Sequence, residues 1–363
     1  MIAQALIIAS ATLAAFQYQC DCPPIDIPSP AFNVRFDVDG CTGAIVRGTA
    51  DVFNGEGFGL FQVVFNDNNI DPTQPQRTAV TYVTKPPNCL HIQPTPHGRM
   101  IYAPPIRVPL VLPTGEVIPE AIEMSRKIHI PNAATPQNPD IPGAKDFIRY
   151  YDRVKNLTSM PVTVDVAFVG RLAPVGSDAV PPIIRRGPGW VFIGDGPQYG
   201  RPFVGLVYYR GLDARADKVV HFEYPDREGL LSVVYKNVEL PPNKPVAFLN
   251  FLVQTWEPMA ATASESQRSL STSDVTMQSM DNVVKDPDLS DLPPDDGKTL
   301  WNWFLDTDVN VDGYVNVLDL IIVRNDLGKT PESAGNPRSD VNADLRINVI
   351  DLILVRNDLG WPF

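Results

Sequence analysis

The stretch that begins at Asp308 reads DVNVDGYVNVLDLIIVRNDLG, and 32 residues later the stretch that begins at Asp340 reads DVNADLRINVIDLILVRNDLG. Fifteen of the 21 aligned positions are identical. Agreement of this length identifies an internal duplication in which each copy is one supersecondary unit. The two copies therefore decide the fold of the C-terminal end of the chain.

Each copy begins with oxygen-bearing side chains at positions 1, 3, 5, 9 and 12 of a loop. They are Asp308, Asn310, Asp312, Asn316 and Asp319 in the first copy, and Asp340, Asn342, Asp344, Asn348 and Asp351 in the second. Position 7 supplies a backbone carbonyl, from Tyr314 and Arg346. Calcium is a hard cation that takes six to eight oxygen ligands, and this is the spacing of an EF-hand loop. We therefore expect two Ca²⁺ ions, one in each loop.

The two loops differ at position 6, where the sharp turn of the loop favours a positive φ. The first loop has Gly313 there and the second has Leu345. A left-handed backbone costs a residue with a Cβ roughly 1–2 kcal/mol, so we expect the second site to be weaker.

Each loop is followed by a helical pattern. An apolar stripe is predicted from Leu320, Ile321, Val323 and Leu327, and again from Leu352, Ile353, Val355 and Leu359. Gly328 and Gly360 are suitable helix stops.

A duplicated calcium loop with an exiting helix resembles the type I dockerin module, and the resemblance covers Leu305 to Phe363. It implies a small α-helical domain that attaches the chain to a cohesin-bearing scaffold. At loop positions 10 and 11, where the family often carries small hydroxyl residues, this chain has Val317-Leu318 and Val349-Ile350. This departure argues against a cohesin partner, and the apolar pairs instead either belong to a core or dock against another domain or surface protein. The partner of the module is thus either cohesin-like or another cell-surface protein.

Residues 25–258 have the pattern of a mainly β fold, an antiparallel β-sandwich. Short runs rich in Val, Phe, Tyr and Thr alternate with clusters of Pro, Gly, Asn and Asp. Strands are predicted at Phe58–Phe65, Thr78–Val83, Trp190–Ile193, Val204–Tyr209, Val219–Tyr224, Leu231–Val238 and Pro245–Gln254. Phe147–Val154 and Val162–Val169 are predicted to form a hairpin, with Val162, Val164, Val166 and Phe168 on the buried face. The proline-rich segment from Pro86 to Pro142 fits no regular element.

The middle region is similar to bacterial extracellular β-sandwich modules. The residues that carry the similarity are Asn156-x-Thr158, Pro161–Val164, Gly170-x-Leu172, Gly176–Asp178 and Leu240–Phe248. Such modules are mostly adhesive or of unknown role, so the similarity implies little chemistry.

The segment 259–299 is predicted to be a disordered linker, the alternative being a long surface loop. Nine of the nineteen residues from Ala261 to Ser279 are Ser or Thr, and an acidic, proline-containing run follows from Asp286 to Asp296. The predicted domains are thus a signal peptide at 1–15, the sandwich at 25–258, this linker, and the calcium module at 300–363.

The N-terminus has the pattern of an export signal, because Ile2 to Ala15 is apolar, uncharged and too short to span a bilayer. A buried N-terminal strand or helix is the alternative. An exported chain with four cysteines is expected to form disulfides that join Cys20 and Cys22 to Cys41 and Cys89, in either pairing; four free buried thiols are the alternative. We expect a secreted or surface-attached bacterial protein without a transmembrane segment in the mature chain.

The net charge is −12, and it is concentrated at the C-terminal end. Residues 259–299 hold eight acidic and three basic residues and residues 300–363 hold ten and five, so the other residues carry only −2. No basic surface for nucleic acid is predicted.

The sequence favours a non-catalytic binding, adhesion or structural protein, with polysaccharide as a candidate ligand. The alternative is a dockerin-bearing glycoside hydrolase, which needs two carboxylates about 5–10 Å apart. Its candidates are Asp146, Asp152, Glu223, Asp226 and Glu228, none within a recognised motif. Trp190 and Trp256 are either sugar platforms or core residues.

Overall fold

A computed structural model gives the fold of the chain. It describes residues 21–29, 34–47, 58–67, 76–112, 114, 116–131, 147–172, 183–187, 190–194, 203–208, 216–222, 229–255, 277, 280, 283, 292, 300–302, 307–310, 314–331, 333–342 and 345–360. The predicted signal peptide and Cys20 lie outside these residues.

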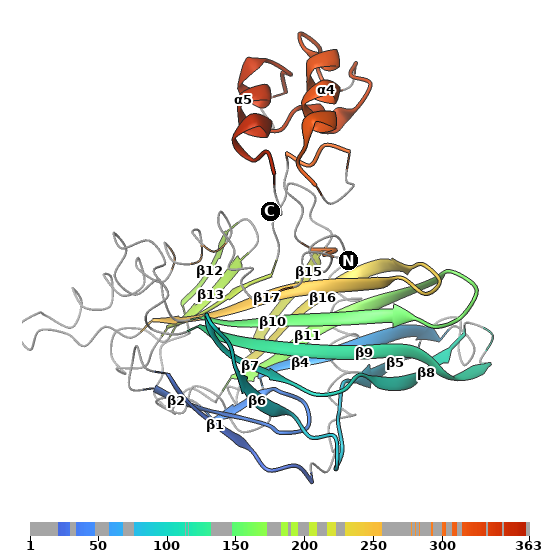
Figure 1. Cartoon of the computed structure of the whole chain (residues 1–363), viewed down its shortest axis with the longest axis vertical. Coiled ribbons are helices and arrows are strands. Elements are labelled where there is room, and N and C mark those ends of the chain that lie inside the picture. Colours follow the sequence, from blue (N-terminus) through green and yellow to red (C-terminus); the bar gives the residue numbers. More distant parts are fainter. Residues whose placement is uncertain are drawn as a thin grey trace, which may run out of the picture.

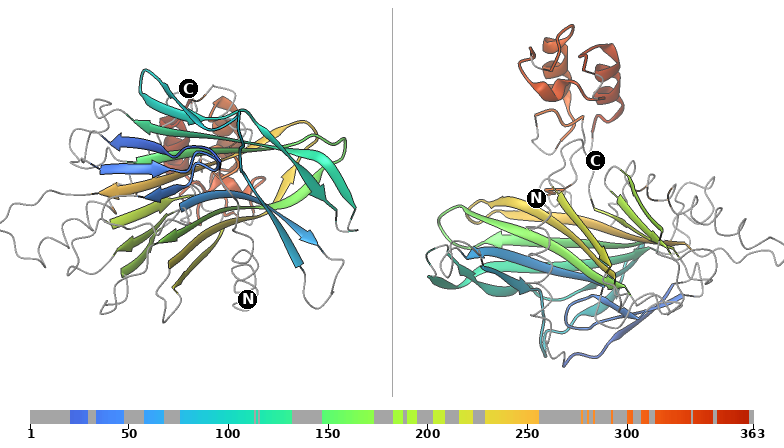
Figure 2. Two further views of the ribbon diagram at one scale, coloured as in Figure 1. Left: turned by 90° about the horizontal axis from the view of Figure 1, so that it is seen from below. Right: turned by 180° about the vertical axis from the view of Figure 1, so that it is seen from behind.

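Two antiparallel sheets form the larger part of the described chain, in two layers (Figures 1 and 2). The first sheet has the strand order β1-β2-β3-β4-β11-β16-β15, and β5 also pairs with β4. Its strands are β1 (Ile25–Ser29), β2 (Val34–Val38), β3 (Ile45–Arg47), β4 (Phe58–Asp67), β5 (Gln76–Thr81), β11 (Val162–Leu172), β15 (Ala216–Phe222) and β16 (Gly229–Leu240).

The second sheet has the order β12-β13-β14-β17-β10-β9-β7-β6, and β8 pairs with β9. Its strands are β6 (His91–Pro94), β7 (Gly98–Tyr102), β8 (Ile106–Val111), β9 (Val117–Pro131), β10 (Phe147–Asn156), β12 (Ile183–Gly187), β13 (Trp190–Gly194), β14 (Phe203–Val207) and β17 (Pro245–Thr255). The predicted antiparallel β-sandwich is therefore confirmed.

The core between the sheets contains an ion pair. Arg126 of β9 and Asp152 of β10 are directly opposite in the ladder, and both side chains are buried. The Arg126 Nε donates to Asp152 Oδ1 at 2.6 Å, and Nη2 donates to Oδ2 at 2.8 Å. The remaining guanidinium nitrogen donates to the carbonyls of Thr42 and Gly59. These bonds join β9 and β10 of one sheet to strand β4 and to the turn before β3 of the other.

Aromatic rings enclose this ion pair. The guanidinium carbon of Arg126 lies 4.9 Å from the ring centroid of Tyr150 and 5.7 Å from that of Phe61. Burial alone would lower the pKa of Arg126, but the charge of Asp152 and its hydrogen bonds raise it above its ordinary value. The guanidinium therefore stays charged at every physiological pH.

The predicted hairpin of Phe147–Val154 and Val162–Val169 is wrong, because the two strands belong to different sheets. β10 pairs with β9 and β17, whereas β11 pairs with β4 and β16. The buried Asn156 shapes the connection, since its Nδ2 donates to the carbonyls of Met160 and Leu240 and its Oδ1 accepts from the amide of Thr158. The alternation of apolar and polar residues does not distinguish a hairpin within one sheet from a connection between strands of two different sheets. The predicted inner face of β11 is correct at Val164, Val166 and Phe168, and Val162 packs against the same core.

The proline-rich segment contains regular structure, contrary to prediction. β6 to β9 lie within it, and residues 122–130 of β9 alternate between core and outer face. Its prolines sit where a missing amide does no harm, at strand ends such as Pro94 and Pro131 or on the exposed edge at Pro109 of β8. The buried Arg126 stands in the apolar series Ile122, Met124, Ile128 and Ile130.

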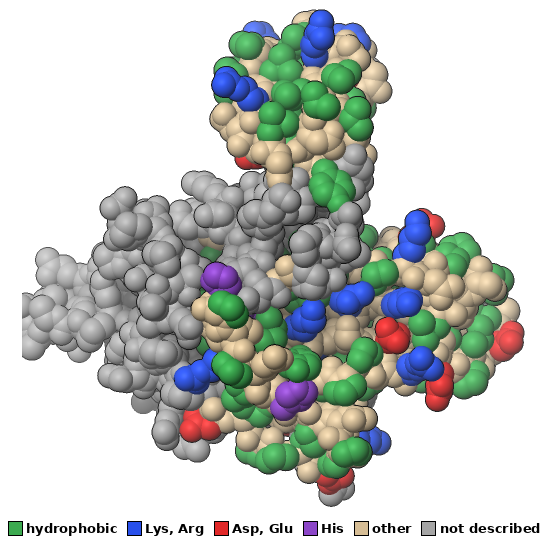
Figure 3. Space-filling model, viewed as in Figure 1, with side chains coloured by type: hydrophobic (Ala, Val, Ile, Leu, Met, Phe, Trp, Pro, Cys, Tyr) green, Lys and Arg blue, Asp and Glu red, His purple; other side chains and the backbone are tan. Residues whose placement is uncertain are grey.

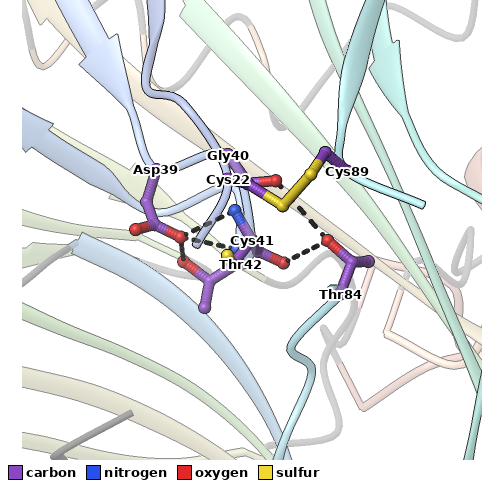
Figure 4. Close-up of a disulfide and its surroundings, with 7 residues drawn as sticks. All are labelled: Cys22, Asp39, Gly40, Cys41, Thr42, Thr84 and Cys89. Carbon is purple, nitrogen blue, oxygen red and sulfur yellow. Dashed lines mark hydrogen bonds between the residues drawn. A yellow bond between two sulfur atoms is a disulfide. The ribbon is translucent and has the colours of Figure 1, made fainter. Parts of the chain in front are cut away.

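A disulfide joins Cys22 to Cys89, one of the pairs that the sequence predicts (Figure 4). Cys41 is also disulfide-bonded. The turn around Cys41 is held on both sides, because Asp39 Oδ1 accepts from the amides of Cys41 and Thr42 while Thr84 Oγ1 donates to the Cys41 carbonyl. The amide of Leu90, next to Cys89, donates to the carbonyl of Gly40 at 3.0 Å, so the disulfide lies next to this turn.

The predicted linker is packed at several residues. Met280 and Val283 are buried against Phe147, Phe251 and other residues of the second sheet. Disorder throughout 259–299 is therefore incorrect at these positions, because three apolar side chains at helical spacing, including Met277, give this part of the segment a face to bury. No helix in the described parts of the chain has the length and apolar character to cross a membrane.

Candidate calcium-binding module

The two C-terminal repeats form matching loops and helices. α4 (Val317–Asp326) follows the first loop and α5 (Val349–Asn357) follows the second, and a short 3₁₀ helix, η2 (Pro337–Ser339), lies between them. The N-caps are Asn316 and Asn348, at loop position 9, and each accepts a backbone hydrogen bond two residues ahead. The asparagines therefore start the helices as well as serving as candidate ligands.

The position-12 carboxylates hold each loop closed. Asp319 is fully buried, and its two oxygens accept the amides of Asn310 at 3.1 Å and Asn316 at 2.9 Å. Asp351 is equally buried and accepts the amides of Val341 and Asn348 at 2.9 and 2.8 Å. Each carboxylate oxygen has a second lone pair. One side chain can thus clamp both ends of its loop and still offer oxygen to a cation.

The chemistry of the loops fits calcium. Asp308 and Asp340, at position 1, are buried, and so are Asp319 and Asp351, at position 12 of the same loops. Buried carboxylates need compensation by hydrogen bonds, opposite charges or a metal. The structure describes Asn310, Tyr314 and Asn316 of the first loop and Asn342, Arg346 and Asn348 of the second. These residues would supply the remaining oxygens.

Asp312, Gly313 and Asp344 lie outside the described residues. Where the structure describes the chain, no three His, Cys, Asp or Glu side chains cluster as a metal site. The third acidic ligand of each loop is among the residues that it leaves out, so the two complete ligand sets stay a prediction.

The backbone at Leu345 is left-handed, as the sequence predicts for position 6. Its φ is +66°, its amide donates to Asp340 Oδ2 at 2.9 Å, and its side chain is 65% exposed. The left-handed turn therefore points the Leu345 amide at Asp340, the ligand at loop position 1. The exposed leucine side chain makes little packing contact that would offset the backbone strain.

We expect Leu345→Gly to strengthen the second calcium site by very roughly five- to thirty-fold, because glycine adopts a positive φ without the ~1–2 kcal/mol penalty. Leu345→Ala is the matched control, since it removes the exposed side chain but keeps the Cβ. Calorimetric titration of the full chain with calcium measures both variants. An equal gain from alanine would show that side-chain bulk, and not backbone strain, weakens the site.

The predicted helical stripes are partly wrong. Val323 and Val355 are buried, and Leu320, Ile322, Leu352 and Leu354 pack around them. Ile321, Leu327, Ile353 and Leu359 are exposed instead. The difference arises because each helix buries the face that carries its position-12 aspartate. Ile322 and Leu354 therefore pack against the core in place of Ile321 and Ile353.

Reciprocal hydrogen bonds join the two repeats, and the sequence reasoning missed them. Gly328, at the end of the first helix, donates to the carbonyl of Ile347 in the second loop, and Gly360 donates to Val315 in the first, both at 2.8 Å. Both glycines have positive φ and end their helices as predicted. Each repeat therefore closes the loop of the other.

Side chains repeat this exchange. Ser339, just before the second loop, donates to Asp326 at the end of the first helix, and Thr307 donates to Asp358 in the same way. The available signal was a hydroxyl residue at the position before each loop and an aspartate near each helix end, 32 residues apart. The hydrogen bonds from Lys329, Gly335, Asn336 and Ser339 lower the pKa of Asp326 against the raising effect of burial.

The structure gives no support to the candidate catalytic residues that it describes. Asp152 is fully buried and bound to Arg126, so it faces no substrate. Trp190 is buried in the apolar cluster that also contains Phe147, Phe251 and Met280, so it is a core residue rather than a sugar platform. Asp146, Glu223, Asp226, Glu228 and Trp256 lie outside the described residues.

The family model of the dockerin type I domain matches residues 306–360, the part that holds both loops and both helices. No curated protein sequence matches the chain.

Among solved structures, a polysaccharide lyase is 13% identical with a TM-score of 0.36 over 63% of this chain and 33% of its own. The Slr1438 protein from Synechocystis sp. PCC 6803 is 10% identical with a TM-score of 0.40 over 66% of this chain and 99% of its own. A mutant heparan sulfate lyase HepC from Pedobacter heparinus is 9% identical with a TM-score of 0.34 over 70% and 42%. The chain thus spans about a third of the first protein, and similarities this low carry no conclusion about function.

Proposed function

We propose that the dockerin type I module attaches this chain, in a calcium-dependent manner, to a cohesin-type partner within an extracellular or cell-surface complex. The β-sandwich would then be the part that the complex presents, as a non-catalytic binding, adhesion or structural domain. Two calcium ions, held by the duplicated loops, would keep the module folded.

The observation that carries this proposal is the pair of clamped loops. In each, a buried position-12 aspartate accepts hydrogen bonds from an amide near the start of the loop and from the amide of the asparagine that caps the exiting helix. The ligand spacing, the helix starts and the family match at residues 306–360 all support the same module.

The exposed faces of the two helices support a protein partner. Six large aliphatic side chains stand between 44% and 61% exposed: Val317, Leu318, Ile321, Val349, Ile350 and Ile353. Figure 3 shows hydrophobic side chains gathered on one face of the module with basic side chains near them. An apolar surface of this kind is buried favourably against another protein. We therefore expect a partner whose contact surface is apolar rather than hydroxyl-lined.

The two faces are equivalent by the duplication, since Val317, Leu318 and Ile321 correspond to Val349, Ile350 and Ile353. Exposed arginines follow on both helices, Arg324 on α4 and Arg356 on α5. The module therefore offers nearly the same surface twice, and either copy is able to meet a partner.

We expect Val317→Ser/Leu318→Ser to leave most partner binding intact, and the same change at Val349 and Ile350 to do likewise. The variant with all four serines should bind at least about tenfold more weakly, because burial of each aliphatic side chain contributes roughly 1.5–3 kcal/mol. Cohesin modules encoded by the source organism, titrated against the full chain with calcium and with a chelator, provide the measurement.

Val117→Ser is the control, because this sandwich residue is also exposed, at 56%. It should leave the affinity unchanged. Binding that survives the four-serine change would remove the helix faces from the interface, and binding that ignores the chelator would contradict the calcium dependence.

A further inference from the structure

The central strand β17 has an edge that β14 does not cover. β14 pairs with β17 only from Phe203 opposite Thr255 to Val207 opposite Phe251. β17 itself begins at Pro245, and β10 pairs with its other side along residues 245–253. The first half of β17 therefore needs another partner for its backbone groups on the β14 side.

Three residues just before the calcium module supply that partner. Leu300 forms a parallel bridge with Ala247, and the amide of Trp301 donates to the Ala247 carbonyl at 2.8 Å. The side chain of Asn302 then takes the place of a strand residue, because its Oδ1 accepts the amide of Leu249 and its Nδ2 donates to the Leu249 carbonyl, both at 2.8 Å.

Asn302 also reaches the opposite sheet. Its Nδ2 lies 2.7 Å from the carbonyl of Tyr208 and 2.8 Å from the hydroxyl of Tyr235, which comes from β16. Tyr235 in turn donates to Asn250 of β17 at 2.6 Å. Asn302 is fully buried, and the ring of Trp301 packs against the rings of Tyr235 and Phe248. A single amide side chain thus connects both sheets to the segment that precedes the module.

Residues further upstream are seated on the same sheet. Met280 is fully buried with Val283 and Leu300 in the cluster on the outer face, and Met277 and Leu292 pack against it. A Cβ at Gly205 of β14 would overlap the sulfur of Met280, so the sheet is shaped to receive this methionine.

We propose that the chain after β17 returns to the sandwich and is locked there by Asn302, so that Met280, Val283 and Leu300–Asn302 are integral to the β-domain. Only residues 303–306 then separate Asn302 from Thr307, the first residue of the calcium module that the structure describes. This replaces the predicted linker of 259–299 and moves the domain boundary from residue 300 to residue 302.

The test is a chain that is cut within the Ser/Thr-rich stretch. A recognition sequence for a site-specific protease, inserted after Ser266, divides the chain into two fragments that no disulfide joins, because all four cysteines precede residue 90. We expect the two fragments to co-elute on size exclusion at micromolar concentration, with calcium and equally with a chelator. Separation of the wild-type fragments would overturn the proposal. Release by the chelator alone would also overturn it, because the calcium module and not Asn302 would then hold the halves together.

Asn302→Ala in the cut chain should weaken the association about 10- to 100-fold, since it removes both hydrogen bonds that the Asn302 side chain makes to the buried backbone of Leu249. Asn88→Ala, at an exposed position, is the matched control and should change nothing. Asn302→Ser provides a milder variant if alanine prevents folding. An unchanged association in both Asn302 variants would refute the role of this residue.

Discussion

Removal of calcium should unfold residues 306–360 and leave the β-sandwich folded. The module has a small core of six buried aliphatic residues, Val309, Val315, Val323, Val341, Ile347 and Val355. Against this core stand the acidic side chains of two loops, whose mutual repulsion is on the order of 1–4 kcal/mol per pair at 4 Å. Calcium binding offsets this repulsion. Because the unfolded chain has no calcium site, the free energy of calcium binding adds to the stability of the folded module.

Calorimetry of the full chain with and without a chelator measures this effect. We expect two unfolding transitions with calcium and the loss of one without it, together with the loss of the helical circular dichroism signal. The sandwich transition should stay in place, because none of its described core residues belongs to the loops. A helical signal that survives the chelator would contradict the expectation.

Because hydrogen bonds join the two repeats, a single substitution in one loop should also disrupt the other loop. Asp319→Ala opens the first loop, which receives the hydrogen bond of Gly360 through Val315. We therefore expect it to abolish calcium binding at the second loop at ordinary concentrations as well. Asn325→Ala, an exposed change on the same helix, is the control. A second loop that titrates with its normal affinity in Asp319→Ala would show that the repeats fold separately.

The largest loss of stability in the sandwich is expected from Asp152→Ala. It leaves the guanidinium of Arg126 buried without its counter-charge, and removal of one partner of such a pair costs roughly 3–5 kcal/mol. Replacement of both residues, as in Arg126→Met/Asp152→Leu, should restore much of that loss because no charge is then buried. Chemical denaturation of the sandwich transition, as a double-mutant cycle, gives both numbers.

An exposed pair provides the contrast. Arg107 and Glu120 lie 3.9 Å apart with side chains 56% and 72% exposed, and Glu120→Ala should change the stability by at most about 1 kcal/mol. If Asp152→Ala were equally mild, water or another group would have to solvate Arg126, and the enclosure by Phe61 and Tyr150 would not isolate it.

The sequence predicts those parts of the structure that depend on local spacing. The helices after the two loops and the glycine stops follow from residue types at fixed intervals, and the left-handed turn at Leu345 follows from its position in the loop. Most strands of the sandwich follow from β-branched and aromatic runs between turn residues. The family match, at residues 306–360, covers both repeats.

The parts that the sequence did not predict depend on residues far apart in the chain. Nothing near Asn302 indicates that its side chain completes the edge of a strand more than fifty residues away. The separation of β10 and β11 into different sheets is similar, because both alternate in the way that a hairpin would. Arg126 shows a third limit, since a charged residue within an alternating strand becomes favourable only once Asp152 stands opposite it.

The lock at Asn302 also determines how the protein would carry tension. A pull on the C-terminal module reaches residue 302 before any earlier residue, and there it meets the central strand β17 rather than a loose chain end. The hydrogen bonds of Trp301 and Asn302 to Ala247 and Leu249 would then have to break before the chain upstream of Leu300 could be pulled from the sandwich.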